Sequence, residues 1–199
     1  MAKRTAAAAL RNREALAAAL DELLPERGTV LELGSGTGEH AVFLAARFPA
    51  LSWQPSDPDP LARASVEAWA AEARLPNLRP PLDLDLRLDA WRRRQAAAIL
   101  CVNLLQVTPP AVTTALFEGA ARVLAAGGPL LVYGPFPHRG APLRGRLLRL
   151  DGQLRKVDPA LGVREVEALG EEAARHGLSL RTELAMPEEG DRLLAFAVS

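Results

Sequence analysis

The residues of this sequence that are best placed to hold a ligand form a short glycine-rich segment near the N-terminus. Gly34, Gly36 and Gly38 follow the apolar run 29–33, so a strand is expected to end there in a tight turn. Glycine has no Cβ, which lets the backbone of such a turn approach a ligand closely. In an open α/β sheet, this turn also leads into the unsatisfied N–H groups of the next helix. The segment therefore predicts a site for a nucleotide-like ligand.

Two further features indicate which class of ligand binds: the spacing of the glycines, and the acidic residues that follow them. In the dinucleotide-binding fingerprint the last glycine follows the second by three residues, whereas Gly36 and Gly38 are two apart, which argues against a pyrophosphate. Asp57 lies near the end of the next expected strand, where a carboxylate can accept hydrogen bonds from ribose hydroxyls. Asp59 competes for this role, although its place ahead of Pro60 also suits a helix N-cap. We expect Asp57 to be the ribose ligand.

Alternating strands and helices position these residues. The apolar pattern predicts a Rossmann-like, doubly wound α/β fold with a mostly parallel, seven-stranded sheet and a C-terminal antiparallel hairpin. The expected strands cover 29–33, 51–55, 78–84, 97–102, 130–133, 178–186 and 192–198. The expected helices cover 6–24, 39–48, 60–73, 110–124 and 163–176, with a short one at 147–156. The strand at 78–84 is the weakest because Pro80 and Pro81 remove two donors from the ladder.

Size, composition and charge exclude several classes of protein. The 199 residues fit one domain, 1–199, and 49% of them are hydrophobic, which is enough to build a core. Lys plus Arg and Asp plus Glu both number 24, so there is no basic excess to hold nucleic acid or an anionic membrane. The single cysteine, Cys101, lies in an apolar run, and no run reaches the roughly 18 residues of a membrane span. We expect a cytoplasmic monomer or homodimer without a metal site.

Several longer motifs resemble one known family. They are Arg11-Asn12-Arg13, Trp53-Gln54-Pro55-Ser56-Asp57-Pro58-Asp59, Tyr133-Gly134-Pro135-Phe136, Leu154-Arg155-Lys156-Val157-Asp158-Pro159, Gly162-Val163-Arg164 and Met186-Pro187. With the pattern Glu32-x-Gly34-x-Gly36-x-Gly38, they make nearly the whole chain similar to the DUF938 family, also called UPF0585 or methyltransferase-like 26. The resemblance implies the class I methyltransferase fold and S-adenosylmethionine-dependent methyltransferase activity. We expect the unidentified acceptor to be a small molecule.

The resemblance also implies a set of cofactor contacts. In class I methyltransferases the glycine loop wraps the methionine part of S-adenosylmethionine. Asp83 and Asp85 follow the third strand, where that fold often puts an acid beside adenine, but either is equally an ordinary turn carboxylate. His40 could approach the cofactor or could be a packed or capping histidine. The expected cofactor-binding residues are Glu32, Gly34, Ser35, Gly36, Thr37, Gly38, His40, Asp57, Asp83, Asp85 and Asn103.

The acceptor side departs from the family pattern. Gln106 stands where the family usually has a histidine, so an amide that cannot move a proton replaces an imidazole that can. Asn103, Gln106 and Tyr133 lie at or just beyond strand ends, and we expect them to orient the acceptor. Two hypotheses stay open: an enzyme with a different acceptor, or an S-adenosylmethionine-binding module without turnover. We favour the enzyme, and a nicotinamide-dependent oxidoreductase is a weaker rival.

A loose segment, 134–162, follows the strand at 130–133 and is a candidate substrate lid. Four arginines lie between residues 139 and 149. They are most simply a solvated face, and the alternative is that they draw an anionic substrate into the cleft. The short basic run Arg92-Arg93-Arg94 is also expected to be solvated.

Overall fold

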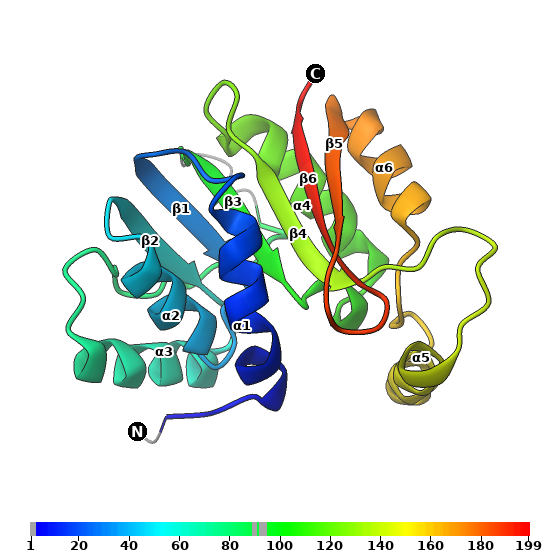
Figure 1. The fold of residues 1–199 in the computed structure, drawn as a ribbon, viewed down its shortest axis with the longest axis horizontal. Helices are drawn as coiled ribbons and strands as arrows, with labels where there is room; N and C mark the ends of the chain where they lie inside the picture. The colour runs from blue at the N-terminus through cyan, green and yellow to red at the C-terminus, as the bar shows by residue number, and fades with distance from the viewer. Residues whose placement is uncertain (1–2, 89–90, 92–94) are drawn as a thin grey trace.

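The computed structural model describes residues 3–88, 91 and 95–199, and its elements follow the expected alternation (Figure 1). The basic run 92–94 lies outside the described residues. The strands are β1 (Gly28–Leu33), β2 (Leu51–Ser56), β3 (Ala98–Val102), β4 (Leu130–Pro135), β5 (Leu178–Ala185) and β6 (Asp191–Val198). The helices are α1 (Ala7–Leu20), α2 (Glu39–Arg47), α3 (Pro60–Ala73), the 3-10 helix η2 (Leu105–Val107), α4 (Pro110–Val123), α5 (Gly145–Val157) and α6 (Val166–Arg175).

These strands form one six-stranded sheet in the order β2-β1-β3-β4-β6-β5. Strands β1, β2, β3 and β4 run parallel to one another, whereas β6 is antiparallel to both β4 and β5. The expected α/β fold with a C-terminal antiparallel hairpin is thereby confirmed. The chain leaves β1 for β2 on one side and returns to β3 on the other, so the strand order reverses beside β1. In open α/β sheets, ligands bind outside the carboxyl ends of the strands at such a reversal.

The count of seven strands is wrong, because the segment 78–84 does not form one. Leu78 and Leu82 make only isolated bridges to β2. Backbone hydrogen bonds join this stretch to β2 at both of its ends. Between them, however, Pro80 and Pro81 have no N–H group with which to continue a ladder. The segment therefore runs along the edge of the sheet without becoming a strand.

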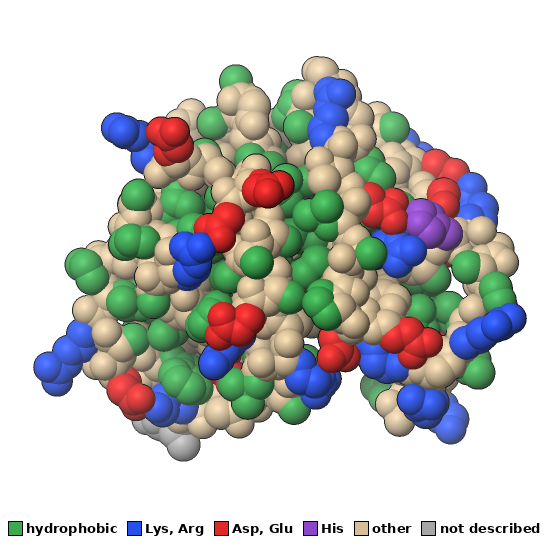
Figure 2. Space-filling model, in the orientation of Figure 1, with side chains coloured by type: hydrophobic (Ala, Val, Ile, Leu, Met, Phe, Trp, Pro, Cys, Tyr) green, Lys and Arg blue, Asp and Glu red, His purple; other side chains and the backbone are tan. Residues whose placement is uncertain are grey.

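Helices cover both faces of the sheet (Figure 1). Successive side chains of a strand point to opposite faces. Ile99 and Val132 consequently join the apolar cluster under α4 and α6, whereas Leu100 and Leu131 join the cluster under α1 and α2. Helix α3 continues the second layer beside α2. Charged side chains of both signs are interspersed over the face that Figure 2 shows.

Several element ends differ from the expected ones. Helix α1 ends at Leu20, and residues 21–24, expected to be helical, form turns. Strand β4 extends to Pro135, so the loose segment after it begins slightly later than expected. Within that segment α5 is slightly longer than the predicted 147–156, and it lies apart from the sheet in Figure 1. Asp59 caps α3 by accepting a hydrogen bond from Leu61 N at 2.9 Å, as its position before a proline indicates.

Candidate functional site

The turn after β1 has a backbone geometry that glycine adopts most readily. Gly34, Gly36 and Gly38 have φ angles of 69°, 55° and 90°, all in the left-handed region. A Cβ on Gly34 would lie 2.9 Å from Leu104 Cδ1, and one on Gly38 would lie 2.8 Å from Val66 Cα. A Cβ on Gly36 would meet no described atom closer than the Gly34 carbonyl oxygen, at 4.0 Å. Packing thus requires two of the glycines, whereas Gly36 keeps space open beside the loop.

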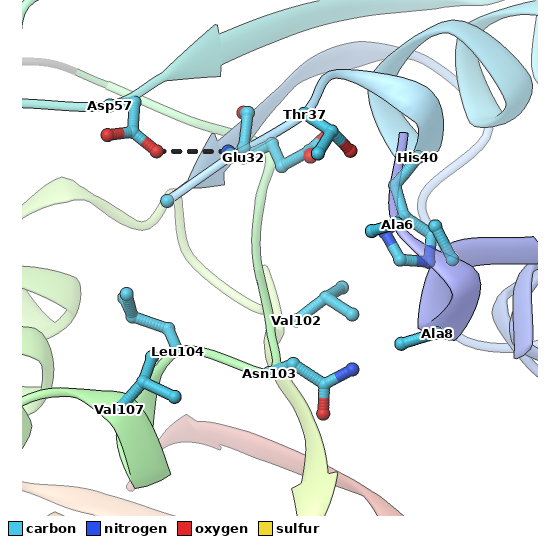
Figure 3. A pocket seen from close by; sticks show the side chains of 14 residues that line it. Ala6, Ala8, Glu32, Thr37, His40, Asp57, Val102, Asn103, Leu104 and Val107 are labelled. Atoms are coloured by element: carbon cyan, nitrogen blue, oxygen red, sulfur yellow. Dashed lines mark hydrogen bonds between the residues drawn. The ribbon is translucent and has the colours of Figure 1, made fainter. Parts of the chain in front are cut away.

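Residues at the end of β2 hold this turn in place. Asp57 Oδ2 accepts a hydrogen bond from Gly36 N at 2.9 Å, drawn as a dashed line in Figure 3. Its other oxygen, Oδ1, accepts from Asp59 N at 2.9 Å. Ser35 N donates to Ser56 O at 2.9 Å, and Ser56 N donates to Ser35 Oγ at 3.1 Å. The glycine turn and the end of β2 therefore form one preorganised unit.

A cavity of about 300 Å³, which we call the loop cavity, opens beside the turn (Figure 3). Its walls come from the start of α1, the glycine turn, the end of β2 and the chain after β3. It is lined by Ala6, Ala8, Ala9, Glu32, Gly34, Ser35, Gly36, Thr37, His40, Asp57, Val102, Asn103, Leu104 and Val107. Three residues expected at the cofactor, Gly38, Asp83 and Asp85, lie outside this lining. The sequence-predicted glycine loop and Asp57 are thus brought together around one cavity.

Glu32 is a buried carboxylate in the wall of the loop cavity. It is 2% exposed and accepts a hydrogen bond from Trp53 Nε1. Burial raises the pKa of Glu32 from 4.5 to about 7. Hydrogen bonds from Trp53 and Ser35 oppose this shift, and the negative charge of Asp57 adds to it. A positive charge placed in the cavity would therefore favour ionisation of Glu32.

His40, at the start of α2, points into the same cavity (Figure 3). Burial, with a smaller contribution from the charge of Arg13, lowers the pKa of His40 from 6.5 to about 4. The imidazole is therefore uncharged near neutral pH and does not repel a cation. Its Nε2 lies 2.8 Å from Asn12 Oδ1, which ties α2 to α1. His40 therefore both lines the cavity and packs against α1.

A second cavity, the side cavity, has a volume of about 180 Å³ and adjoins the loop cavity. Gly34 and Leu104 line both of them. Asp85 lines the side cavity, and its carboxylate also accepts hydrogen bonds from Arg87. The side chain of Asp83 is 73% exposed and pairs with an arginine of α3 instead. Of the two acids considered for the adenine side, Asp85 is the one in a cavity wall.

A third cavity, the hairpin cavity, has a volume of about 270 Å³ and adjoins the loop cavity. Two of the residues expected to orient the acceptor, Asn103 and Gln106, line it. Ala8, Asn103 and Val107 line both cavities. Asn103 has a left-handed backbone, with φ of 54°, and its Oδ1 accepts a hydrogen bond from Gln106 Nε2 at 3.2 Å. Gln106 lines the hairpin cavity, and its buried Oε1 has no hydrogen-bond partner among the described residues. Asn103 and Gln106 thus meet where the two cavities join.

Tyr133 has a different place from the one expected. It lines neither the loop cavity nor the hairpin cavity. Its hydroxyl donates to Asp191 Oδ2 at 2.8 Å, and burial together with this acidic partner raises the pKa of Tyr133. Asp191 Oδ1 accepts from Arg146 Nη2, and both of these residues line the hairpin cavity. Tyr133 therefore supports the cavity wall from behind.

Five polar residues of the hairpin cavity come from three distant parts of the chain and were not among the expected site residues. They are Arg11, Asn12, Arg146, Glu188 and Asp191. Asn12 could have been found from the sequence, because it is a polar residue on the apolar face of the expected helix. In the structure it is 4% exposed, and the other buried residues of α1 are all apolar. A polar residue at a core position of a helix indicates a specific partner. Of the others, Arg146 is one of the four arginines that the sequence analysis considered for an anionic substrate.

Other chemical possibilities find little support in the described part of the chain. No group of three or more His, Cys, Asp or Glu side chains there could hold a metal ion. In the same residues, no helix has both the length and the apolar character needed to cross a membrane. Cys101 is buried in β3, and burial raises the pKa of its thiol to about 12, which leaves it un-ionised.

Solved methyltransferases share this architecture. An O-methyltransferase family protein from Burkholderia thailandensis matches with a TM-score of 0.81 at 17% identity, over 96% of this chain and 57% of that one. The methyltransferase CalO1 of calicheamicin biosynthesis, in its SAH-bound form, gives 0.78 at 18% identity, over 96% and 54%. The O-methyltransferase NcsB1 of neocarzinostatin biosynthesis, in complex with S-adenosylmethionine and 2-hydroxy-5-methyl naphthoic acid, gives 0.73 at 19% identity, over 96% and 54%. The chain has their fold and spans just over half of their length.

The sequence itself identifies the family. A family described as "Protein of unknown function (DUF938)" matches residues 3–197, which is nearly the whole chain. This match confirms the resemblance inferred from the motifs, and the chain belongs to the DUF938 family.

Proposed function

We propose that this protein is an S-adenosylmethionine-dependent methyltransferase that acts on a small-molecule acceptor. The observation that carries the proposal is the loop cavity: a left-handed glycine turn, pinned by Asp57, opens on a space of about 300 Å³ at the reversal point of the sheet. The structural neighbours that bind S-adenosylmethionine or SAH have the same fold, which supports this choice of cofactor.

The residues around the loop cavity suit the chemical groups of S-adenosylmethionine. The open space at Gly36 suits close approach of a ligand to the backbone. Asp57 is fixed beside that space and would accept hydrogen bonds from ribose hydroxyls. Glu32 would supply negative charge to a cationic ligand, and the uncharged His40 would not oppose it. Asp85, in the adjoining side cavity, is our candidate for the adenine amino group.

When bound, the cofactor would supply a methyl group on a positively charged sulfur. The protein would then act mainly by holding the acceptor in line with that group and by excluding water. Asn103 lies between the loop cavity and the hairpin cavity, so it can contact molecules in both. Gln106 would orient the acceptor through its amide. This mechanism requires no covalent intermediate on the protein.

Calorimetric titration with S-adenosylmethionine and with S-adenosylhomocysteine tests the cofactor directly. We expect both to bind with dissociation constants in the micromolar range, on the order of −8 kcal/mol. NAD, titrated in the same way, should not bind. A folded sample that bound neither compound at millimolar concentration would refute the proposal, and preferential binding of NAD would select the oxidoreductase.

Turnover distinguishes the enzyme from a binding module. With S-adenosylmethionine carrying a labelled methyl group, the wild-type protein should transfer label to a small acceptor in a metabolite pool. The adjoining hairpin cavity supports turnover, because a binding module has no need of a second cavity that meets the first at shared residues. Binding without labelled product from a broad pool of metabolites would favour the module.

A further inference from the structure

The hairpin cavity has a lining that restricts the chemistry of whatever occupies it. We propose that it is the acceptor pocket and that it takes a small, uncharged molecule that presents a hydrogen-bond donor to Gln106. This inference rests on the proposed methyltransferase function and specifies its substrate class. It draws on three observations: the junction between the two cavities, the pairing of the charged side chains, and the unpartnered amide oxygen.

The first observation is the junction. Ala8 and Val107 are apolar residues shared by both cavities, and Asn103 is the polar residue shared with them. A molecule in the hairpin cavity would therefore lie next to a ligand in the loop cavity. The volume of about 270 Å³ is just below the lower end of the range for small-molecule sites, which is about 300 to 1,000 Å³. The occupant is accordingly a small metabolite.

The second observation is that the charges of the cavity are already matched. Arg11 Nε lies 3.6 Å from Glu188 Oε1, and Arg146 pairs with the buried Asp191. Arg146 also donates to the Glu189 carbonyl oxygen at 2.8 Å. Two positive and two negative side chains leave no net charge to receive an ion. A charged acceptor would have to break one of these pairs or stay unpaired, and both cost free energy.

This pairing also bears on two of the four arginines in the segment after β4. Arg146 is committed to Asp191, and Arg139 forms ion pairs with Glu165 and Glu171. Neither guanidinium is therefore left to draw an anion into the cleft. These contacts favour a structural use of both side chains.

The third observation is the oxygen of Gln106. Gln106 is 5% exposed, its Nε2 is used by Asn103, and its Oε1 lacks a partner among the described residues. A buried acceptor without a donor is unfavourable, so an incoming O–H or N–H group would be stabilised there. An amide oxygen accepts such a bond but cannot remove the proton. Gln106 thus selects an acceptor with a donor group and orients it.

The charge pairing also constrains the reacting atom. In the transfer, a lone pair on the acceptor nitrogen or oxygen forms a bond to the methyl carbon, and the carbon–sulfur bond breaks with its electron pair staying on sulfur. The acceptor then loses its proton to water. Asp191 and Glu188 are both held by arginines, so neither is a free base. The acceptor atom is therefore one that reacts without a strong base, such as the uncharged nitrogen of an aromatic amine.

The experiment uses the full chain, S-adenosylmethionine with a labelled methyl group, and small molecules of a cell extract. Ion exchange at pH 7 first separates the extract into anionic, cationic and uncharged pools, each of which is then incubated with the protein. We expect label in the uncharged pool. Label mainly in the anionic or cationic pool would overturn this inference but leave the proposed function intact. No label in any pool would remove the proposed turnover, and the inference with it.

Two variants test whether the hairpin cavity is the pocket. Leu150 lines it from α5, so L150W should fill it and lower transfer about tenfold or more, while the affinity for S-adenosylmethionine measured by calorimetry stays the same. L148W is the matched control, because Leu148 lies on the same helix, is 58% exposed and lines none of the three cavities. Equal transfer by L150W and L148W would overturn the assignment of the pocket.

Q106L tests the hydrogen bond within that pocket. Leucine keeps much of the volume of Gln106 and removes its amide, so kcat/KM for the labelled acceptor should fall about tenfold, with cofactor affinity unchanged. A variant that transfers at the wild-type rate would contradict the role of Gln106 in orienting the acceptor. Thermal unfolding of Q106L checks that the protein is still folded.

Discussion

The loop cavity and the hairpin cavity are built in different ways. The loop cavity depends on the backbone of one turn and on acids at the ends of neighbouring strands. The hairpin cavity depends on side chains from α1, η2, α5 and the turn before β6, which lie far apart in the sequence. A backbone cradle tolerates few substitutions, whereas a wall of separate side chains can change one residue at a time. Cofactor and acceptor specificity can therefore vary independently in this fold.

The strongest test of this comparison is the substitution Gly36→Val. The φ of 55° is unfavourable for valine, and its side chain would enter the open space beside the loop. We expect the affinity for S-adenosylmethionine, measured by calorimetry, to fall about 100-fold or more, which corresponds to about 3 kcal/mol. Normal binding by this variant would show that the loop is wrongly assigned.

Gly127→Val is the matched control for that experiment. Gly127 has a φ of 76° in the turn that precedes β4, and a Cβ added to it would meet no described atom within 4 Å. Both variants carry backbone strain of about 1 to 3 kcal/mol, so their thermal stabilities should fall together. Only Gly36→Val should lose cofactor affinity.

The sequence could predict the loop cavity because its determinants are local. The glycines, Glu32 and Asp57 lie at the ends of two strands that are each visible as apolar runs, and parallel strands bring such ends to one edge of the sheet. The sequence favours Asp57 over Asp59 as the ribose ligand, which stays a prediction. The structure shows that Asp57 holds the loop, whereas Asp59 caps α3.

The hairpin cavity could not be predicted in the same way. Its ion pairs join residues such as Arg11 and Glu188, whose approach depends on the packing of α1 against the hairpin rather than on any local spacing. Tyr133 illustrates the same limit, because it lies within β4 rather than at its end and its hydroxyl is taken by Asp191. The prediction for the segment 78–84 is wrong for a local reason. Its apolar residues favour a strand, but its two prolines prevent a continuous ladder, and only isolated bridges form.

The second prediction compares two neighbouring aspartates. Asp57→Ala removes both the candidate ribose ligand and the hydrogen bond to Gly36 N, so cofactor affinity should fall about 10- to 100-fold. Asp59→Ala removes the N-cap of α3, so stability should fall by about 1 kcal/mol while cofactor affinity is kept. Calorimetry and thermal unfolding of both variants measure the two effects. If Asp59→Ala lost more affinity than Asp57→Ala, the roles would have to be exchanged.

The third prediction concerns pH and Glu32. The pKa of this acid is about 7 in the folded protein and 4.5 as its ordinary value, so the folded state holds the proton more tightly. The free energy of unfolding should therefore fall as pH rises from about 5 to about 7, by on the order of 3 kcal/mol, and should level off above that range. Glu32→Gln should lack this fall, which urea titrations at several pH values would measure.

Cofactor binding should show the opposite dependence on pH. A positively charged ligand favours the ionised form of Glu32, so affinity for S-adenosylmethionine should be about tenfold higher at pH 8 than at pH 6. His40, with a pKa of about 4, stays uncharged throughout this window. The ionisable groups of S-adenosylmethionine affect wild type and Glu32→Gln equally, so the difference between their pH profiles reports on Glu32 alone. Identical pH profiles for the two proteins would show that Glu32 does not sense the bound charge.

The smallest effect separates Asp85 from Asp83. Asp85 lies in the wall of the side cavity, which adjoins the loop cavity at Gly34 and Leu104, so it is the acid that could reach the adenine amino group. Its hydrogen bonds with Arg87 compete for the same carboxylate and should limit the effect of Asp85→Ala to about three- to fivefold in cofactor affinity. Asp83 is exposed and pairs with α3, so Asp83→Ala should bind like wild type. Titrating each variant with adenosine as well as S-adenosylmethionine tells which part of the ligand is affected: a loss at the adenine should appear with both. A loss confined to S-adenosylmethionine would place Asp85 near the methionine end and would reverse the orientation that we infer for the cofactor between these two cavities.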